Sequence, residues 1–177
     1  MSRLNLDTQR SPAASQPLLE QIQRAFGATP NMFKAVSNSP AALQSMWAAF
    51  GALGRGSIGA LLGEQIAVAI ANRNRCEYCL AAHTVLGKNA GASAAQMDQA
   101  QAGRSDDPRT AAALEFALKV VEQRAQITDA DVARLREAGF GDEQIVEIMA
   151  HIALNLFTNY VNVAFDVPVD FPKVALK

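Results

Sequence analysis

The chain has 177 residues, half of them hydrophobic, and its 16 basic and 17 acidic residues give a net charge of -1. This length allows one domain with a core of its own, and no cluster of Lys or Arg marks a nucleic-acid or membrane-surface binder. Residues 1–17 lack the apolar segment of a secretory signal, and the longest apolar run, Ile58 to Ile70, is shorter than the about 20 residues that cross a bilayer. We therefore expect a cytoplasmic protein that contacts neither nucleic acid nor membrane.

The two ends of the chain differ from its middle. Residues 1–15 are polar and offer little to bury, so we expect a flexible N-terminal arm, followed by one helical domain over residues 16–177. The tail, residues 166–177, carries Pro168 and Pro172, which cannot continue a helix. It must therefore pack back on the domain or cross to a neighbouring subunit.

Helix start and stop signals recur between the ends. Three pairs place an N-cap residue before a proline at the first helical position, and Thr128 with Asp131 resembles a capping box. The pairs are Thr29-Pro30, Ser39-Pro40 and Asp107-Pro108. Glycines stand where a left-handed residue would close the preceding helix, at Gly27, Gly54, Gly91, Gly103 and Gly139.

These signals predict an all-α fold class, a single-domain helical bundle. No stretch alternates apolar and polar residues with β-branched enrichment, as a strand does. The expected helices lie near residues 17–26, 30–37, 40–53, 57–72, 76–90, 93–101, 108–125, 129–138 and 142–165.

The only two cysteines lie in the stretch RCEYCLAAH, residues 75–83. If a helix begins near Cys76, then Cys76, Cys79 and His83 occupy positions i, i+3 and i+7 and share one face. In a reducing compartment, two close cysteines are more often catalytic or metal-binding than structural.

The surroundings of the cysteines favour a reactive thiolate. The pKa of a cysteine falls at a helix N-terminus or beside cations, and Arg73 and Arg75 immediately precede the motif. We expect Cys79 to be the attacking sulfur, because His83 at i+4 can take its proton, and Cys76 to resolve the sulfenic acid into a disulfide. The reverse order, as in thioredoxin-type motifs, stays open.

Glu64 is the next candidate. It is flanked by Leu61 and Val68 on a helix that is apolar around most of its circumference, where a carboxylate is unfavourable without a partner. The short connection at residues 73–75 should bring this helix against the cysteine helix. We therefore expect Glu64 to act as a proton acceptor or relay.

Zinc binding is the alternative for the same residues. Cys76, Cys79, His83 and either Glu64 or His151 would supply four ligands. The stronger zinc signals, a second Cys-x-x-Cys or a His-x-x-x-His pair, are absent from the sequence. The motif therefore favours redox chemistry over metal binding.

Glu64 and the segment CEYCLAAH together resemble the signature of the AhpD-like alkylhydroperoxidases within the carboxymuconolactone decarboxylase superfamily. The segment HIALNLFTNYVNVAFDVPVDFP resembles that of the peroxidase-related branch, so the resemblance covers roughly residues 30–172. It implies an all-helical fold, a peroxidatic Cys79 and a resolving Cys76. It also implies a Glu64 and His83 proton relay, no metal or other cofactor, and homo-oligomers, commonly trimers or hexamers.

Tyr78 departs from the pattern of that family. In the AhpD proteins a second histidine directly precedes the second cysteine, and Tyr78 removes this potential proton-transfer group. The true carboxymuconolactone decarboxylases generally lack the paired cysteines, which argues against that activity for this chain.

A polar stripe marks the last predicted helix. His151, Asn155, Asn159 and Asn162 fall at i, i+4, i+8 and i+11 among Ile, Leu, Phe and Val. Because unpaired polar groups in a core are unfavourable, the stripe either forms a structural hydrogen-bond network or lines the active-site cavity.

Several apolar residues near helix starts and centres either pack in the core or wall a pocket for an organic hydroperoxide. They are Met32, Phe33, Met46, Trp47 and Phe50.

The leading functional hypothesis is a thiol-dependent peroxidase that reduces organic hydroperoxides through a Cys76–Cys79 disulfide, which an external dithiol or thiol reductant then reduces. A disulfide reductase or redox sensor would use the same chemistry. A non-enzymatic oligomeric protein, with a small apolar ligand in its cavity and the thiols as a switch, is the alternative from another class.

Overall fold

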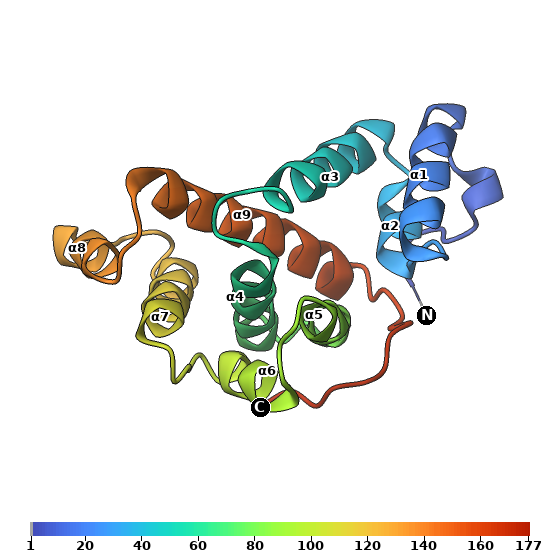
Figure 1. Cartoon of the computed structure of the whole chain (residues 1–177). Coiled ribbons are helices and arrows are strands. Elements are labelled where there is room, and N and C mark those ends of the chain that lie inside the picture. Colours follow the sequence, from blue (N-terminus) through green and yellow to red (C-terminus); the bar gives the residue numbers. More distant parts are fainter. Residues whose placement is uncertain (1) are drawn as a thin grey trace.

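The computed structural model describes residues 2–177, and every regular element in this range is helical (Figure 1). The α-helices are α1 (Gln16–Phe26), α2 (Asn31–Val36), α3 (Pro40–Leu53), α4 (Ala60–Arg73), α5 (Glu77–Asn89), α6 (Ala94–Gln101), α7 (Pro108–Glu122), α8 (Asp129–Glu137) and α9 (Asp142–Ala164). Two 3-10 turns, η1 (Thr8–Arg10) and η2 (Ala13–Ser15), precede them. The predicted all-α class is confirmed. No helix within residues 2–177 is both long and apolar enough to cross a membrane.

Helix caps explain why most predicted boundaries agree with the structure. The side chain of Ser39 accepts a hydrogen bond from the backbone N–H of Ala42, and that of Asp107 accepts one from Thr110. The capping box of Thr128 and Asp131 is present at the start of α8. Each cap satisfies N–H groups that the first turn leaves unpaired, so it acts within a few residues.

Four details of the predicted boundaries were wrong. Helix α4 begins at Ala60 instead of 57, after Gly59 with φ +81°, and α7 ends at Glu122 instead of 125. Pro30, not Thr29, is the N-cap of α2. Gly54 ends α3 with φ -64°, in the right-handed region, so its backbone does not need glycine.

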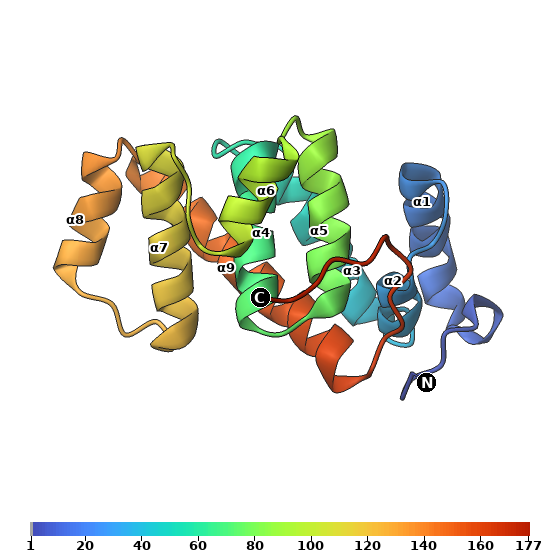
Figure 2. The same cartoon turned by 90° about the horizontal axis from the view of Figure 1, so that it is seen from below.

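Helix α4 is the centre of the fold and packs against α5, α6, α7 and α9. Residues 65–71 within it are all buried, as its nearly uniform apolar surface predicts. Figure 2 shows α7, α6 and α5 side by side with α9 crossing behind them. Helix α5 packs along α4, and its Gly87 leaves room for the side chain of Met97 on α6, which a Cβ at that position would overlap. The cysteine helix therefore lies directly against the helix that carries Glu64.

The N-terminal segment contacts the folded domain, while the flexible arm expected for residues 1–15, of which residue 1 lies outside the described residues, stays a prediction. The Ser15 hydroxyl donates to the carbonyl oxygen of Ser37 at 2.8 Å, and the hydroxyls of Ser11 and Ser37 lie 2.7 Å apart. The backbone N–H of Arg3 donates to the carbonyl oxygen of Phe165 at 2.8 Å. The polar side chains of this segment thus find hydrogen-bond partners on the folded domain.

The C-terminal tail, residues 166–177, packs back on its own chain, which is one of the two outcomes expected. A carboxylate oxygen of Asp170 accepts from the backbone N–H of Asn31 at 2.8 Å, and the N–H of Lys177 donates to Asn72 Oδ1 at 2.9 Å. In Figure 1 the tail, in red, runs from the end of α9 past α5 and finishes beside α6.

Candidate active site

The two cysteines occupy the first turn of α5. Cys76 is the N-cap residue, and its Sγ accepts a hydrogen bond from the backbone N–H of Cys79 at 3.4 Å. The two thiols lie close enough for each to shift the pKa of the other. Both residues are free thiols and only 1 % exposed. The sequence therefore placed the helix start and the proximity of the sulfurs correctly.

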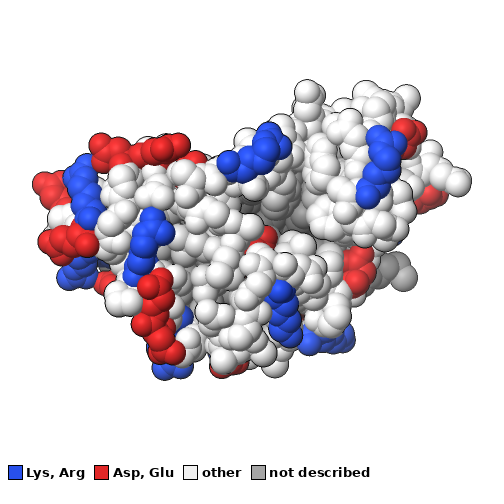
Figure 3. Space-filling model, in the orientation of Figure 1, with Lys and Arg blue, Asp and Glu red and all other residues white. Residues whose placement is uncertain are grey.

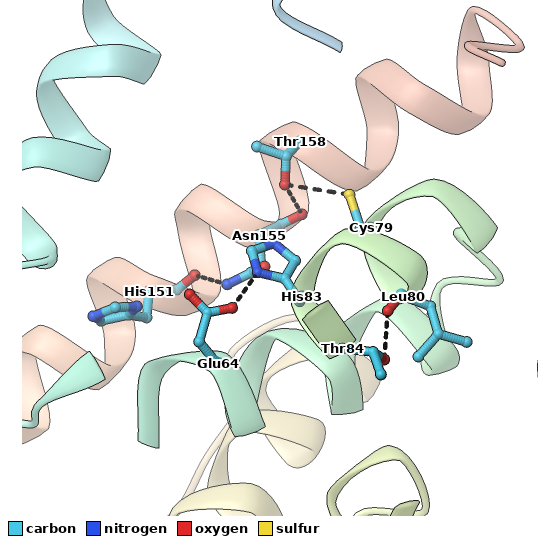
Figure 4. Close-up of polar contacts among 8 residues, drawn as sticks. All are labelled: Glu64, Cys79, Leu80, His83, Thr84, His151, Asn155 and Thr158. Carbon is cyan, nitrogen blue, oxygen red and sulfur yellow. Dashed lines mark hydrogen bonds and ion pairs between the residues drawn. The ribbon is translucent and has the colours of Figure 1, made fainter. Parts of the chain in front are cut away.

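Cys79 is the more acidic thiol. Burial opposes its ionisation, but the hydrogen bond with Cys76, the positive charge of His83 and the amide of Asn162 outweigh burial and lower the pKa of Cys79 to about 6. Asn162 Nδ2 donates to Cys79 Sγ at 3.1 Å. Thr158 Oγ1 lies 3.8 Å from the same sulfur, as Figure 4 shows.

Cys76 has the opposite character. Its hydrogen bond to Cys79 and its burial raise the pKa of the Cys76 thiol far above the ordinary value. A thiol that keeps its proton can donate to a neighbouring thiolate, so the pair divides into one ionised and one protonated sulfur. Cys79 is therefore the sulfur that ionises first.

Glu64 and His83 form a close pair beside the thiols. His83 Nδ1 lies 2.7 Å from Glu64 Oε2, and the two side chains are 9 % and 22 % exposed. Burial disfavours the protonated imidazole, whereas the charge and hydrogen bond of Glu64 favour it, and together these effects raise the pKa of His83. Figure 4 shows Glu64 reaching from α4 toward His83, one turn beyond Cys79 on α5. The structure thus brings together all four predicted site residues.

The two arginines before the motif do not act as predicted. Arg73 pairs with Glu122 at 3.0 Å, and Arg75 Nη1 donates to the carbonyl oxygen of Lys177 at 3.1 Å. The cation that favours the Cys79 thiolate is His83. The prediction from sequence neighbours was wrong because the Arg75 backbone turns with φ +56° just before the helix begins, and both arginine side chains contact other groups instead of the thiols.

A cavity of about 270 Å³ opens onto Cys79, between α1 to α3 on one side and α4, α5 and the tail on the other. It is lined by Ala25, Phe26, Pro30, Met32, Phe33, Trp47, Phe50, Gly51, Glu64, Tyr78, Cys79, Ala82, His83, Leu86 and Phe171. We call it the Cys79 cavity. Four of the five predicted wall residues are among these, whereas Met46 is 1 % exposed and belongs to the core. The face in Figure 3 is hollowed where α1 to α3 meet the rest of the molecule, and mainly uncharged residues surround the hollow.

Tyr78 anchors the wall of this cavity. Its hydroxyl oxygen accepts from the backbone N–H of Met32 at 3.1 Å, and its ring meets Phe171 edge-on with centroids 5.7 Å apart. Burial raises the pKa of Tyr78, which the Met32 hydrogen bond opposes and Asp170 reinforces. Tyr78 therefore stays a neutral phenol that joins α5 to α2 and the tail.

The polar stripe of α9 shows both predicted arrangements, because some of its residues form buried hydrogen bonds and others line a cavity. Asn162 reaches Cys79, and Asn159 is buried, where its Oδ1 accepts from Asn74 Nδ2 at 3.1 Å. His151 and Asn155 line a second cavity of about 100 Å³, which also touches Glu64 and His83. Within residues 2–177, His151 Nε2, Asn159 Nδ2 and Asn162 Oδ1 have no hydrogen-bond partner.

The candidate zinc ligands are not arranged around a common point. Among residues 2–177, no group of three or more His, Cys, Asp or Glu side chains is arranged to hold a metal ion. Instead, His83 Nδ1 engages Glu64 and Cys79 Sγ engages Asn162. The zinc alternative therefore lacks a ligand cluster in the part of the chain that the structure describes.

The fold and this site define a class of helical protein with two thiols at a helix start, a Glu–His pair beside them and an apolar cavity above. The sequence model of the carboxymuconolactone decarboxylase family matches residues 40–123. The structure of an uncharacterized peroxidase-related protein from Silicibacter sp. TM1040 is similar with a TM-score of 0.82 and 27% identity, over 98% of this chain and 92% of that chain. Over residues 40–123 the chain is therefore similar to the carboxymuconolactone decarboxylase family, and its fold is similar to that of the peroxidase-related proteins, in agreement with the AhpD-like superfamily that the sequence resembles.

Two further structures share the fold. An uncharacterized peroxidase-related protein from Ralstonia eutropha JMP134, described as an alkylhydroperoxidase AhpD core, has a TM-score of 0.84 and 26% identity over 96% of this chain and 92% of that chain. The apo debrominase Bmp8 has a TM-score of 0.76 and 20% identity, over 94% of each chain. No curated protein sequence matches the chain.

Sequence reasoning missed two contacts of Cys79. Asn162 was assigned only to a stripe of undecided role, and Thr158 was not singled out. Thr158 is 1 % exposed and, like Asn162, belongs to the buried face of α9. The sequence offered one signal for these contacts, because Thr158 and Asn162 are polar residues among apolar ones near the end of a long helix. This pattern predicts a buried polar side chain, but it does not predict which group that side chain contacts.

Proposed function

We propose that the protein is a thiol-dependent peroxidase that reduces organic hydroperoxides. The observation that carries this proposal is that Cys79 lines an apolar cavity together with Glu64 and His83, whereas Cys76 does not line it. A hydroperoxide in this cavity contacts the acidic thiol of Cys79, and the Cys76 thiol lies outside the cavity lining, next to Cys79. The cytoplasm, where we expect the protein, would return both sulfurs to the reduced state.

The first half of the reaction needs a nucleophile and a proton donor. The Cys79 thiolate attacks the terminal oxygen of the hydroperoxide, the O–O bond breaks, and Cys79 becomes a sulfenic acid. The departing alkoxide takes a proton from His83, which Glu64 holds in its protonated form, and leaves as an alcohol. Pairing with Glu64 at 2.7 Å supports this role for His83.

The second half forms the disulfide. His83, now neutral, accepts the proton of Cys76, and the Cys76 thiolate attacks the Cys79 sulfur. The hydroxyl group of the sulfenic acid takes up that proton and leaves as water. An external dithiol then reduces the Cys76–Cys79 disulfide and is itself oxidised to a disulfide. Its two protons restore the Cys76 thiol and the protonated His83, and Cys79 returns to the thiolate.

The proposal is tested by peroxide consumption with dithiothreitol as reductant. We expect Cys79→Ser to consume no peroxide above the dithiothreitol background, and Glu64→Gln or His83→Gln to lose roughly a hundredfold in rate. The matched variant Cys76→Ser should still form a sulfenic acid on Cys79, which dimedone traps and mass spectrometry locates. Full activity of Cys79→Ser would exclude the mechanism.

Reductive dehalogenation is a second candidate, favoured by the aromatic walls of the cavity. A cysteine-to-alanine variant of the debrominase Bmp8 has been solved with 2,3,4-tribromopyrrole, at 21% identity and a TM-score of 0.78 to this chain. Attack of a thiolate on bromine would convert an aryl bromide and two thiols into the arene, a disulfide and hydrogen bromide. Release of bromide from a bromopyrrole, together with slow reaction with all hydroperoxides, would favour this function over the first.

A further inference from the structure

Aromatic side chains are concentrated around the Cys79 cavity. Six of the eleven Phe, Tyr and Trp residues of the chain line it: Phe26, Phe33, Trp47, Phe50, Tyr78 and Phe171. The rest of the core is built mainly from Ile, Leu, Val, Met and Ala. More than half of the aromatic residues therefore line one cavity.

The rings are arranged as two walls. On the side of α1 to α3, Phe33 has its ring centroid 5.8 Å from Trp47 and 5.9 Å from Phe50, both nearly edge-on. On the opposite side, Phe171 meets Tyr78 at 5.7 Å. Centroid separations of this size are those of favourable aromatic pairs, so a further ring placed between the walls would continue the same packing.

The size of the cavity suits a small organic ligand. Its volume is about 270 Å³. One aromatic ring with a short substituent fits this space, whereas hydrogen peroxide would leave most of the apolar wall without a contact.

Charge limits the ligand further. Among residues 2–177, no Lys or Arg lines the cavity, and Glu64 is the only acidic residue that does. An anionic ligand would be repelled by the Glu64 carboxylate. The only cation beside it would be His83, whose Nδ1 is already paired with Glu64 Oε2 at 2.7 Å. The polar lining, formed by Glu64, Tyr78, Cys79 and His83, belongs to α4 and α5, opposite the rings of α1 to α3.

We propose that the Cys79 cavity selects a compact, uncharged molecule with one aromatic ring and that the preferred substrates are monocyclic aryl-alkyl hydroperoxides. The ring lies between the two aromatic walls, and the hydroperoxide group points to Cys79 and His83. The substrate part of this inference rests on the proposed peroxidase function, whereas the binding part can be tested without turnover.

The chain supplies its own reporter of binding. Trp47 is the only tryptophan, it lines the cavity, and its indole N–H donates to Gln21 Oε1 at 3.2 Å. A ligand in the cavity changes its surroundings, so we expect 2-phenyl-2-propanol to change Trp47 fluorescence in a saturable way. This alcohol keeps the ring but has no O–O bond. Its saturated analogue, 2-cyclohexyl-2-propanol, should bind at least about fivefold more weakly, and benzoate should bind more weakly than benzyl alcohol.

A matched pair of variants locates the ligand. Phe171→Leu removes a cavity ring from the C-terminal tail, and we expect it to weaken binding of 2-phenyl-2-propanol about three- to tenfold. Phe157→Leu removes a ring from the outer face of α9, outside this cavity, and should leave binding unchanged. Equal affinity for the phenyl and cyclohexyl alcohols, or no saturable change, would overturn the inference.

Single-turnover oxidation of Cys79 separates this inference from the proposed function. We expect cumene hydroperoxide to react at least about tenfold faster than tert-butyl hydroperoxide or hydrogen peroxide. Oxidation by all three at similar rates would overturn the ring preference and leave the peroxidase standing. Saturable binding of 2-phenyl-2-propanol without oxidation by cumene hydroperoxide would overturn the peroxidase and keep the aromatic cavity.

Discussion

At the scale of single residues, the chemistry depends on how differently the fold treats two identical thiols. The Cys79 sulfur accepts hydrogen bonds from Cys76 and Asn162 and lies near the positive charge of His83. Cys76, in contrast, keeps its proton and donates it in the hydrogen bond to Cys79. Hydrogen bonds to the charged form of a group stabilise that form. Two thiols three residues apart on one helix therefore differ in acidity, and this difference supports the proposed roles of Cys79 as nucleophile and Cys76 as resolving thiol.

This difference predicts a pH dependence of alkylation. Since the pKa of Cys79 is lowered to about 6, its thiolate fraction should rise as pH increases through 6, far below the about 8.5 of free cysteine. Iodoacetamide alkylation followed by mass spectrometry should give this inflection at Cys79, while Cys76 stays unmodified below pH 9. Asn162→Ala should move the inflection upward by about one pH unit. An inflection near 8.5 at Cys79 in the folded wild type would contradict the prediction.

At this scale the sequence predicted that the four candidate residues lie close together, but not the contacts that come from distant segments of the chain. Glu64 and His83 were assigned because a carboxylate on an apolar helix and an imidazole one turn from a thiol both need partners, and each is the partner of the other. Asn162 could not be assigned, because it lies 83 positions from Cys79 and only the packing of α9 on α5 joins them.

At the scale of the elements, caps decide where helices begin. The Asp131 carboxylate accepts from the N–H and hydroxyl of Thr128 at 2.8 Å each and from Lys119 Nζ of α7 at 2.7 Å. One side chain thus closes the first turn of α8 and fastens that helix to α7. The Lys119 hydrogen bond, followed by those of Thr128, lowers the pKa of Asp131 to about 2.

The lowered pKa has a consequence for acid stability. Its stabilising contribution is complete above the unfolded pKa of about 3.9 and is lost as pH falls from about 4 to about 2. We expect Asp131→Asn to lower the thermal midpoint by a few degrees at pH 7, and this difference should shrink across that window. Calorimetry at several pH values measures it.

The control for this prediction is Glu115→Gln. Glu115 pairs with Arg134 across the same two helices, but both side chains are more than 60 % exposed. Exposed ion pairs contribute little to stability, so this variant should melt close to the wild type at each pH. A midpoint difference for Asp131→Asn that is the same at pH 2 and pH 7 would contradict the linkage.

At the scale of the whole molecule, α9 presents two faces. Its inner face carries Thr158 and Asn162 toward the thiols, and its outer face exposes large apolar side chains, among them Val146 at 69 %, Tyr160 at 60 % and Val163 at 49 %. An apolar stripe along a long helix is typical of a surface that another protein covers. We therefore keep the homo-oligomer expected from the sequence as a proposal and place its contact on this face.

The proposal predicts the mass of the protein in solution. The wild type should scatter light as a multiple of 18.9 kDa, and Tyr160→Asp combined with Val146→Glu should shift it toward the single-chain mass. Ala133→Glu, which adds a charge at an exposed position of α8, should leave the mass unchanged. A wild type of single-chain mass at high concentration would exclude the assembly.

The sequence alone determined the features that depend on neighbours within a few residues. Caps and prolines placed most helix starts, and the spacing of Cys76, Cys79 and His83 gathered them on one turn because a helix repeats every 3.6 residues. The order of the helices also predicted that α4 lies against α5, since a connection of only three residues keeps consecutive helices close together.

Only the tertiary structure decided which distant groups meet. The contact of Asn162 with Cys79, the two aromatic walls and the return of Phe171 over Tyr78 join segments that are far apart in the chain. Such contacts follow from how helix faces pack together, which local hydrogen bonds and backbone preferences do not specify. For this reason the sequence could name the candidate reacting residues and several apolar residues of the cavity, whereas it could not show that these residues meet around one cavity.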